Sequence, residues 1–575
     1  MRFTLYIFLF CSISLTAQYK HILPESDYVH WPDYKHLEFE DLSEIEKQKW
    51  NPTNHTIEGW DFSLPDGLAP APNSLLGISR KINFNGFFDK YKLNFRANVT
   101  AVIWARWRDL EPKEGEYQIE RLQSYIKEAK QNNYKVVLRI LSTSKTRGPD
   151  LNNPNRGDAP LWLENYGIPI LPREEDRYNL NFDPAHPEFH KRYIKLIDKV
   201  FEGEIPELVD AAYIGYASRS YGDEGIGPHH NDPEKNDKLV HVRERIDAFG
   251  RAFENMEHKV FMGGPSHYGL SKGFGLRRGF VEMYLYTIPN VYIGQYVDDE
   301  GYLYVDETAP IIANVSFNGE ENEEYEPAWV TKERGFRFGN TTNSFTYRYF
   351  ISSLRALQMR CTYLLASGHL IPEMVPFIAQ ELGRTVIDAP DVWTFLYTAK
   401  ISSQQYIKNE ESSTVRRNFT VDELYNGMDV KNFERWLYQR DSEGFETEPA
   451  LKINRAIKMW MVQPGNDFDY IARKGERIGF DIDDRWLKKN TNKKFVVKIT
   501  YLDDTNGRMK LHYKFNGRDV FSSEKLMNDN KIKTATFIVN DIDSNALEND
   551  YDFIVSANKK ASDITISMVR VVALN

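Results

Sequence analysis

Residues 99–140 read VTAVIWARWRDLEPKEGEYQIERLQSYIKEAKQNNYKVVLRI. Two apolar, strand-like runs, Val99–Trp104 and Lys135–Ile140, flank a segment in which apolar residues occupy positions 119, 122, 125, 126 and 129. That spacing is typical of an amphipathic helix with one buried face. A strand, a helix and a second strand in this order predict two parallel strands joined by a helical crossover.

The same alternation of strands and helices continues from about residue 75 to about residue 395 and predicts an α/β fold. The strand runs are Leu75–Ile82, Val99–Trp104, Lys135–Ile140, Ala211–Ala217, Lys259–Gly263, Val291–Gln295, Ile311–Phe317 and Cys361–Ala366. The helix candidates are Glu120–Gln131, Pro187–Phe201, Val240–Asn255 and Phe345–Arg360. This number of strands favours a (β/α)8 TIM barrel. An open, doubly wound sheet is the alternative, although no GxGxxG motif opens a helix after the first strand.

The chain divides into five predicted parts. These are a signal peptide at 1–17, an N-terminal arm at 18–72, the catalytic barrel at 73–395, a connecting region at 396–450 and a β-sandwich at 451–575. Short strand runs separated by turn clusters after residue 450 predict that the last part is an antiparallel β-sandwich. The sandwich either binds glycan or braces the barrel, and we expect the bracing role.

The N-terminus has the pattern of a secretory signal. Arg2 precedes the apolar run Phe3–Leu15, and Thr16-Ala17-Gln18 offers a small-residue cleavage point. The run is too short to span a bilayer, so we expect a secreted or periplasmic protein with no membrane span after signal removal. Cleavage leaves Cys361 alone, and a lone cysteine in an apolar setting predicts a buried hydrophobic residue.

Composition narrows the partners. The net charge of −10 argues against nucleic acid or an anionic membrane as the main partner. Aromatic residues make up 14% of the chain, which fits either sugar binding or large aromatic cores. The oligomeric state leaves no mark in the sequence.

Acidic residues follow the fourth and seventh predicted strands. Asp223-Glu224 lies between two glycines after the fourth strand, and an acid-rich segment at 318–326 follows the seventh. In a parallel barrel, the carboxyl ends of the strands carry the active site, so these acids are expected to face one another. Two opposed carboxyl groups can cleave a glycosidic bond, with one acting as proton donor and the other as nucleophile or base.

The segment Trp107–Tyr117, WRDLEPKEGEY, resembles the W-x-x-L-E-P-x-x-G-x-Y segment of retaining (β/α)8 glycoside hydrolases, most closely the β-galactosidase-related families. The resemblance covers roughly residues 75–330. It implies that Glu224 is the acid/base and Glu320 the nucleophile, with Glu321 and Glu324 as alternates. It also implies that Glu111 lies in a structural turn. The chain departs from these families at Asp223, where they usually place Asn.

Four further residues are candidate substrate contacts, together with Asp223. Trp104 and Trp107 are candidate sugar platforms or core residues, and Arg139 is a candidate for a hydroxyl or acidic substituent or for a structural ion pair. Tyr296 closes the sixth predicted strand and is a candidate hydrogen-bond donor to the nucleophile. His229-His230 lacks recognised metal-ligand spacing, so we expect no metal. A two-carboxylate reaction requires no cofactor, so we expect none.

These patterns together predict a secreted glycoside hydrolase acting on a plant or algal polysaccharide or its oligosaccharides, through two carboxylates and with retention of the anomeric configuration. Two alternatives remain: a non-catalytic glycan-binding barrel, and a polysaccharide lyase that uses Tyr and His as base and acid.

Overall fold

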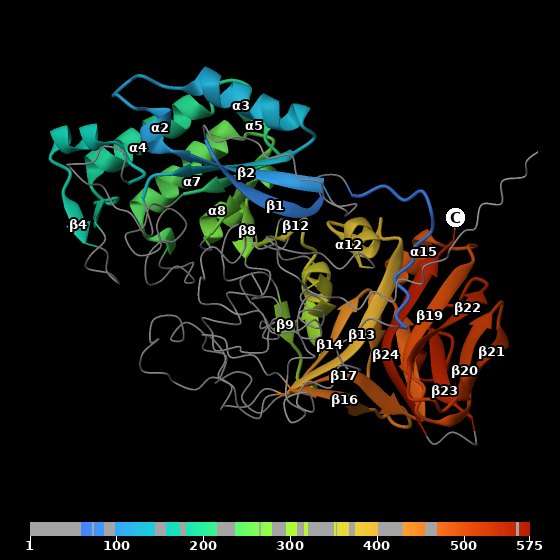
Figure 1. Ribbon diagram of the computed structural model, residues 1–575. Coiled ribbons are helices and arrows are strands. Elements are labelled where there is room, and N and C mark those ends of the chain that lie inside the picture. Colours follow the sequence, from blue (N-terminus) through green and yellow to red (C-terminus); the bar gives the residue numbers. More distant parts are fainter. Residues whose placement is uncertain are drawn as a thin grey trace, which may run out of the picture.

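The structure of the 575-residue chain is a computed structural model (Figure 1). The residues that it describes are 59–71, 74–84, 98–143, 157–172, 180–215, 236–263, 266–278, 295–307, 315–319, 350–351, 353–366, 374–400, 429–454, 468–558 and 563–574.

Eight parallel strands pair into a closed ring in the order β1-β12-β11-β8-β7-β6-β3-β2. They are β1 (Leu75–Asn83), β2 (Asn98–Arg106), β3 (Lys135–Leu141), β6 (Ala211–Ile214), β7 (Val260–Met262), β8 (Gly275–Arg278), β11 (Val315–Gly319) and β12 (Tyr363–Ala366). Each strand lies beside its predecessor in the chain, and β1 pairs with β12 to close the ring. The expected parallel sheet is therefore confirmed, and it is closed rather than open.

Helices cover the outside of this ring (Figure 1). The longer ones are α3 (Ile119–Gln131), α4 (Pro187–Val200) and α7 (Val240–Ala252), and the shorter ones are α2 (Trp107–Leu110), α5 (Ile205–Leu208), α8 (His267–Ser271) and α12 (Val375–Glu381). Residues 350–351 and 353–358 are also helical. The segments after β1 and β8, where further helices are expected, lie largely outside the described residues, so the complete (β/α)8 architecture remains a prediction.

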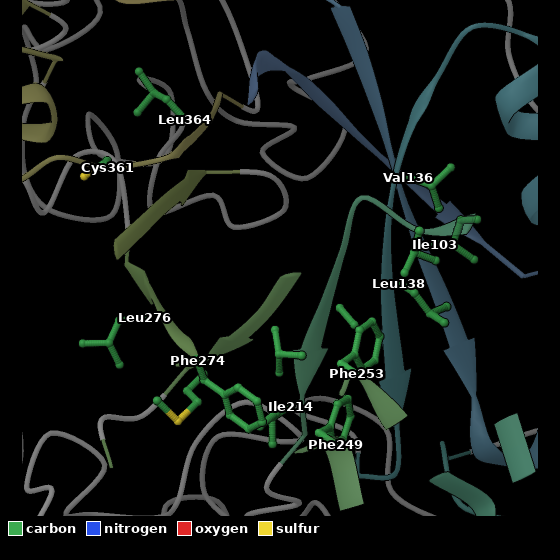
Figure 2. Packing of buried hydrophobic residues seen from close by; sticks show 14 of the residues in the cluster. Ile103, Val136, Leu138, Ile214, Phe249, Phe253, Phe274, Leu276, Cys361 and Leu364 are labelled. Carbon is green, nitrogen blue, oxygen red and sulfur yellow. The ribbon is translucent and has the colours of Figure 1, made fainter. Parts of the chain in front are cut away.

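The helices pack through the apolar faces that their spacing predicts. In α3, Leu122, Tyr125, Ile126 and Ala129 are buried. Figure 2 shows Phe249 of α7, and Phe253 directly after this helix, beside the strands, where α7 contacts β6. Cys361 belongs to this core and is fully buried, as expected of a small hydrophobic residue.

The sixth strand of the ring differs from the prediction. It is β8, at Gly275–Arg278, whereas Val291–Gln295 was expected. Residues 295–297 instead form β9, which pairs antiparallel with β10 (Leu303–Val305) outside the ring. The prediction was wrong because β8 is only four residues long and includes two arginines, so it lacks a continuous apolar run.

Two antiparallel sheets form the C-terminal part of the protein. The larger contains β13 (Asp391–Lys400), β14 (Asp429–Arg435), β16 (Glu448–Asn454), β17 (Phe468–Gly475), β19 (Phe495–Leu502), β22 (Ile532–Val539) and β24 (Ile564–Ala573). The smaller contains β15 (Leu437–Gln439), β18 (Arg477–Ile482), β20 (Asn506–Phe515), β21 (Arg518–Met527) and β23 (Phe553–Ala557), and the short helix α15 (Asp484–Lys489) follows β18. One apolar core lies between the sheets, as expected of a sandwich. Because β13, β14 and β15 belong to these sheets, the sandwich takes strands from before residue 451.

The sandwich and the ring share an apolar boundary. Phe395 and Phe433 of the larger sheet belong to the same buried cluster as Phe350 and Phe377 on the ring side. Residues 59–71 form neither helix nor strand and lie along this boundary: Trp60 packs edge-on against Phe350, with ring centroids 4.8 Å apart. This shared core makes the ring and the sandwich one packed unit.

Residues 59–71 are also held to the sandwich by polar contacts. Lys498 of β19 lies 2.8 Å from the Asp61 carboxylate, and Arg570 of β24 donates to the Asp61 carbonyl oxygen at 2.8 Å. Thr534 of β22 donates to the Gly59 carbonyl oxygen at 2.7 Å. The segment therefore bridges both parts of the protein.

A buried charge network joins α12 to the sandwich. Arg435 of β14 donates to the Glu381 carboxylate at 2.9 Å, and Arg570 donates to the Asp391 carboxylate at 2.8 Å. All four side chains are buried. Burial and the neighbouring Asp391 raise the pKa of Glu381 well above its usual value, while Arg435 opposes the shift. Each acid thus has an arginine partner in a place that water does not reach.

We predict that Arg570→Met destabilises the protein, because it leaves Asp391 buried without its cation beside Glu381. The free energy of unfolding is expected to fall by about 3–5 kcal/mol. Lys113→Met removes the exposed pair that Lys113 forms with Glu116 and should cost less than about 1 kcal/mol. Urea unfolding of both variants measures the difference, and equal losses would contradict the assigned role of the network.

Candidate active site

The carboxyl ends of the eight ring strands meet at one rim, because all their pairings are parallel. At this rim, β2 ends at Arg106, β3 at Leu141, β6 at Ile214 and β11 at Gly319. In barrels of parallel strands the reacting groups lie at this rim. The described residues near it belong mainly to β2, β3 and β6.

A layer of large side chains lies inside the ring just below the rim. Trp104 of β2 is level with Arg139 of β3, which in turn is level with Tyr213 of β6. The guanidinium carbon of Arg139 lies 4.6 Å from the centroid of the Trp104 ring. Arg139 is buried and Trp104 is half-buried, packed against the interior cluster. The structure therefore brings the predicted contacts Trp104 and Arg139 together as a stacked pair.

Arg106 continues the inward-facing column of β2 two residues beyond Trp104. Its Nε donates to the Asp158 carboxylate at 3.0 Å, and its Nη1 lies 3.8 Å from the Asp109 carboxylate. The backbone N–H of Arg108 donates to the Asp158 carbonyl oxygen at 3.0 Å. Asp158 thus anchors the loop before residue 160 to the end of β2.

Asp158 is 9% exposed, and this burial has the largest effect on the pKa of its carboxyl group. Burial raises the pKa of its carboxyl to about 6, although the guanidinium groups of Arg106, Arg108 and Arg139 act in the opposite direction. At neutral pH the carboxylate is ionised and paired with Arg106. Near pH 6 it gains a proton and leaves the arginine charges uncompensated.

The segment after β2 forms a turn around Glu111. The Glu111 carboxylate accepts from the indole N–H of Trp107 and from the backbone N–H of Gly115, both at 2.9 Å. Glu111 is 2% exposed, and Gly115 has a φ of +80°, which suits glycine. Glu111 therefore has the structural position that the resemblance implies.

Trp107 and Trp104 serve different parts of the protein. Trp107 is fully buried, and its ring lies 5.2 Å from Phe189 and 5.5 Å from Tyr193, both of α4. Of the two readings for Trp107, this packing supports the core residue and not the sugar platform. Of the two tryptophans, only Trp104 has a partly exposed indole, and it lies at the mouth formed by the eight strands.

Arg245 of α7 supports the end of β6. It is fully buried, donates to the carbonyl oxygens of Gly215 and Pro184 at 3.5 Å, and lies over the Tyr193 ring at 4.7 Å. Burial and the Arg245 charge lower the pKa of the neighbouring His241 to about 3, which keeps that imidazole neutral. Arg245 thus contacts Gly215, the last described residue before the segment that carries Asp223 and Glu224.

The predicted catalytic residues lie outside the described residues. Glu224 and Asp223 belong to the segment that follows Gly215, and Glu320, Glu321 and Glu324 belong to the segment that follows Gly319. Glu320 is the first residue after β11. Their roles remain predictions.

Tyr296 lies away from the position expected for it. It belongs to β9 and stacks on Tyr304 of β10, with ring centroids 5.5 Å apart. The β9–β10 hairpin is bound to the sandwich: Tyr302 accepts from the backbone N–H of Asp441 at 2.8 Å, and Lys431 N–H donates to the Gly301 carbonyl oxygen at 2.7 Å. Tyr296 therefore does not close a strand of the ring.

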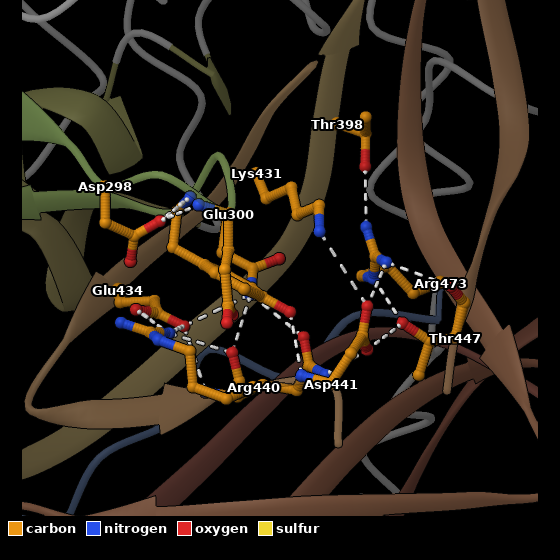
Figure 3. A network of polar contacts seen from close by, with 12 residues as sticks. Asp298, Glu300, Thr398, Lys431, Glu434, Arg440, Asp441, Thr447 and Arg473 are labelled. Carbon is orange, nitrogen blue, oxygen red and sulfur yellow. Dashed lines mark hydrogen bonds and ion pairs between the residues drawn. The ribbon is translucent and has the colours of Figure 1, made fainter. Parts of the chain in front are cut away.

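The polar contacts around this hairpin extend into the sandwich (Figure 3). The Asp441 carboxylate accepts from Arg473 at 2.9 Å and from Thr447 at 2.7 Å, and Arg440 donates to the Glu434 carboxylate at 2.7 Å. Glu434, Arg473 and Asp441 are at least partly buried. We assign this network to structure, since the carboxylates of Asp298, Glu434 and Asp441 each accept from a basic, hydroxyl or backbone donor.

The described residues contain neither a metal-binding cluster nor a membrane-spanning helix. Within that part of the chain, no group of three or more His, Cys, Asp or Glu side chains is placed to hold a metal ion. No helix in the same part is long and apolar enough to cross a membrane.

Sequence reasoning missed Arg106, Asp158 and Tyr213. Arg106 and Tyr213 could have been found from strand alternation, since Arg106 follows Trp104 by two positions and Tyr213 lies inside the fourth apolar run. Asp158 gives no such signal, because it lies in a loop and meets Arg106 only through the fold.

No family model matches this chain, and no curated protein matches it significantly. Similar solved structures include endo-glycoceramidase II from Rhodococcus sp., with 12% identity, a TM-score of 0.30 and coverage of 89% of this chain and 100% of that chain. The catalytic domain of β-amylase from Paenibacillus polymyxa gives 10% identity, a TM-score of 0.29 and coverage of 53% and 97%. A β-glucosidase from Exiguobacterium marinum has 10% identity and a TM-score of 0.19, and the match covers 37% of this chain and 50% of that chain. Similarities this weak do not place the chain in a family.

We predict that Asp158 makes the stability of the protein pH-dependent. Its pKa rises from 3.8 to about 6 on folding, so between these values the native state binds more protons than the unfolded state, and stability falls as the pH rises. Relative to Asp158→Asn, which cannot ionise, the wild type should lose up to about 1.4 kcal/mol per pH unit between about pH 4 and pH 6.

Urea unfolding of wild type and Asp158→Asn across this range measures the difference. Asp198→Asn, at an exposed pair with Arg251, is the matched control and should change the pH dependence much less. A constant gap between wild type and Asp158→Asn would show that the carboxyl titrates as in the unfolded chain.

We also predict that Glu111→Ala destabilises the turn without removing the chemistry. The buried indole N–H of Trp107 loses its acceptor, which should cost about 1–3 kcal/mol, and Glu111→Gln should lose less because its amide oxygen still accepts. Activity per folded molecule should stay near that of the wild type. Loss of activity at unchanged stability would instead place Glu111 at the reacting centre.

Proposed function

We propose that this protein is a glycoside hydrolase that cleaves a plant or algal polysaccharide, or its oligosaccharides, with two carboxyl groups. The observation that supports the proposal best is the order of the ring. Counted along the chain, β6 and β11 are the fourth and seventh strands of the ring. They lie three strand positions apart among eight, nearly opposite one another. The acid-bearing loops start from these two strands.

In the proposed reaction, Glu224 is the proton donor and Glu320 is the nucleophile, with Glu321 and Glu324 as alternates. The nucleophile attacks the anomeric carbon and the Glu224 carboxyl protonates the leaving oxygen, so that a glycosyl-enzyme forms as the glycosidic bond breaks. The Glu224 carboxylate then takes a proton from water, which attacks the anomeric carbon and releases the nucleophile. The sequence of steps retains the anomeric configuration.

The described mouth residues fit a sugar substrate. Trp104 offers a partly exposed ring, Arg106 of the same strand carries a cationic donor, and Arg139 carries another on the neighbouring strand β3. Guanidinium groups hydrogen-bond hydroxyl and carboxylate oxygens. We propose that these residues, with Asp223, hold the sugar that lies next to the scissile bond.

We further propose that the protein is secreted or periplasmic and that it needs no metal or cofactor. Both proposals rest on the sequence: the apolar N-terminal run before Ala17, and a two-carboxylate reaction that uses only protein groups.

We predict that Glu224→Gln lowers kcat on a polysaccharide by about 10²–10⁴-fold, since the leaving oxygen then lacks its acid. An aryl glycoside with a good leaving group should partly escape the loss. Of Glu320→Gln, Glu321→Gln and Glu324→Gln, one should abolish turnover of both substrates. Reducing-sugar release over a panel of polysaccharides is the measurement.

Glu257→Gln is the matched control, because Glu257 precedes β7 and so lies at the opposite rim. Full activity of Glu224→Gln on the polysaccharide would refute the assigned role. No sugar release from any polymer would favour a non-catalytic glycan-binding barrel, and the ultraviolet absorbance of an unsaturated uronate would favour a lyase.

A further inference from the structure

The outer face of the smaller sheet carries a cluster of basic residues on β20. Met509, Leu511 and Tyr513 point inward, since they belong to the core between the sheets. Alternation along the strand therefore places Arg508, Lys510, His512 and Lys514 on the opposite, outer face. This face lies on the part of the sandwich away from the ring (Figure 1).

The neighbouring strand β21 completes the surface. Phe521 lies opposite His512, Ser523 opposite Lys510, and Lys525 opposite Arg508. Phe521 is 63% exposed, and its ring stacks on His512 with centroids 4.4 Å apart and an interplanar angle of 16°. We call Arg508, Lys510, Lys514, Phe521 and Lys525 the β20–β21 patch.

The patch is cationic on an acidic protein. Among the described residues, the ion pair on this face joins His512 to Asp519 at 2.8 Å, and no carboxylate of that part of the chain lies within 4.0 Å of the Lys510 or Lys525 ammonium. Arg508 donates to the Ser523 hydroxyl at 2.9 Å, which leaves its charge uncompensated. The chain as a whole carries a net charge of −10.

Protection of a sheet edge explains only part of this pattern. β21 is an edge strand, and a lysine such as Lys525 discourages pairing with another chain. β20, however, is paired with both β21 and β23 over Met509–Tyr513, so Lys510 has no edge to protect. The exposed Phe521 works against such protection, because an apolar ring on an edge strand offers a surface for association.

We infer that the β20–β21 patch binds an acidic polysaccharide. Arg508 and Lys510 occupy alternate positions of β20, about 7 Å apart along the strand, and Lys525 lies opposite Arg508 on β21, so the three offer a group of positive charges to a polyanion. The Phe521 ring offers a flat apolar surface for the C–H face of a sugar. The choice of a glycan over other polyanions rests on the proposed function. The existence of the patch does not depend on that function.

Such a surface would hold the polymer at the far end of the sandwich and so raise its concentration near the mouth of the ring. It would serve long substrates and leave small soluble ones unaffected. This difference separates the patch from the catalytic residues.

The test is affinity electrophoresis of the full chain in gels that contain polygalacturonate or a sulfated galactan, with neutral β-glucan and single-stranded DNA as comparisons. Retardation is expected in one or both acidic glycan gels, and the pair of polymers separates carboxylate from sulfate recognition. It should weaken as salt is raised from about 50 mM to about 500 mM, because surface charges are screened.

Lys510→Glu/Lys525→Glu should weaken the apparent affinity about tenfold, since two weak attractions become repulsions. Phe521→Ala should weaken it without changing the charge. The matched control is Lys488→Glu/Lys489→Glu, which makes the same charge change on two exposed residues of α15 and should bind as the wild type. All variants should hydrolyse an aryl glycoside at the wild-type rate.

Three results would overturn the inference: undiminished retardation of the Lys510→Glu/Lys525→Glu variant, equal loss in the α15 control, or equal retardation by single-stranded DNA. Failure of the proposed hydrolase activity would appear separately, as an inactive wild type on every glycoside with the gel shift intact.

Discussion

The pairing of β1 with β12 is the constraint on which the rest of the structure depends. Leu75 lies opposite Tyr363, so segments almost three hundred residues apart in the sequence meet and close the ring. Since every pairing in the ring is parallel, closure brings all carboxyl ends to one rim. An open sheet with the same strands would leave β1 and β12 at its edges, and the loops after β6 and β11 would not face a common centre.

Closure of the ring does not determine how the sandwich is oriented against it. That orientation depends on how α12 leads into β13. Glu381 ends α12 and Asp391 begins β13, and both carboxyl groups are buried against arginines from strands much later in the chain. Buried charges contribute little net stability, but they penalise any arrangement that separates them from their partners. Phe395, Phe433 and Trp60 supply the apolar area, and the charge network selects one orientation.

The sequence predicted those features that depend on residues close together in the chain. The apolar face of α3 and seven of the eight ring strands follow from periodicity, because burial imposes it. β8 was missed because a strand of four residues with two arginines carries no apolar signature, and the expected strand at Val291–Gln295 placed Tyr296 wrongly. The start of the sandwich at β13 was also hidden, since an interface strand buried on both faces resembles a ring strand.

The candidate site shows the same division. Trp104 and Arg139 could be named because they lie at or next to the ends of the predicted strand runs, and the structure stacks them. Two other features depend on contacts between distant segments, which a single sequence does not reveal. One is the burial of Trp107 against α4 while Trp104 stays partly exposed, and the other is the hydrogen bond from Arg106 to Asp158.

The position of the arginines constrains the proposed chemistry. β3, which carries Arg139, pairs with β6, from which the Glu224 loop starts, and a nearby cation lowers the pKa of a carboxyl group. A proton donor needs the opposite shift. In the proposed mechanism the ionised Asp158 therefore matters, since its charge offsets Arg106 and reduces the positive potential on this side of the mouth. Asp223, next to Glu224, would act in the same direction.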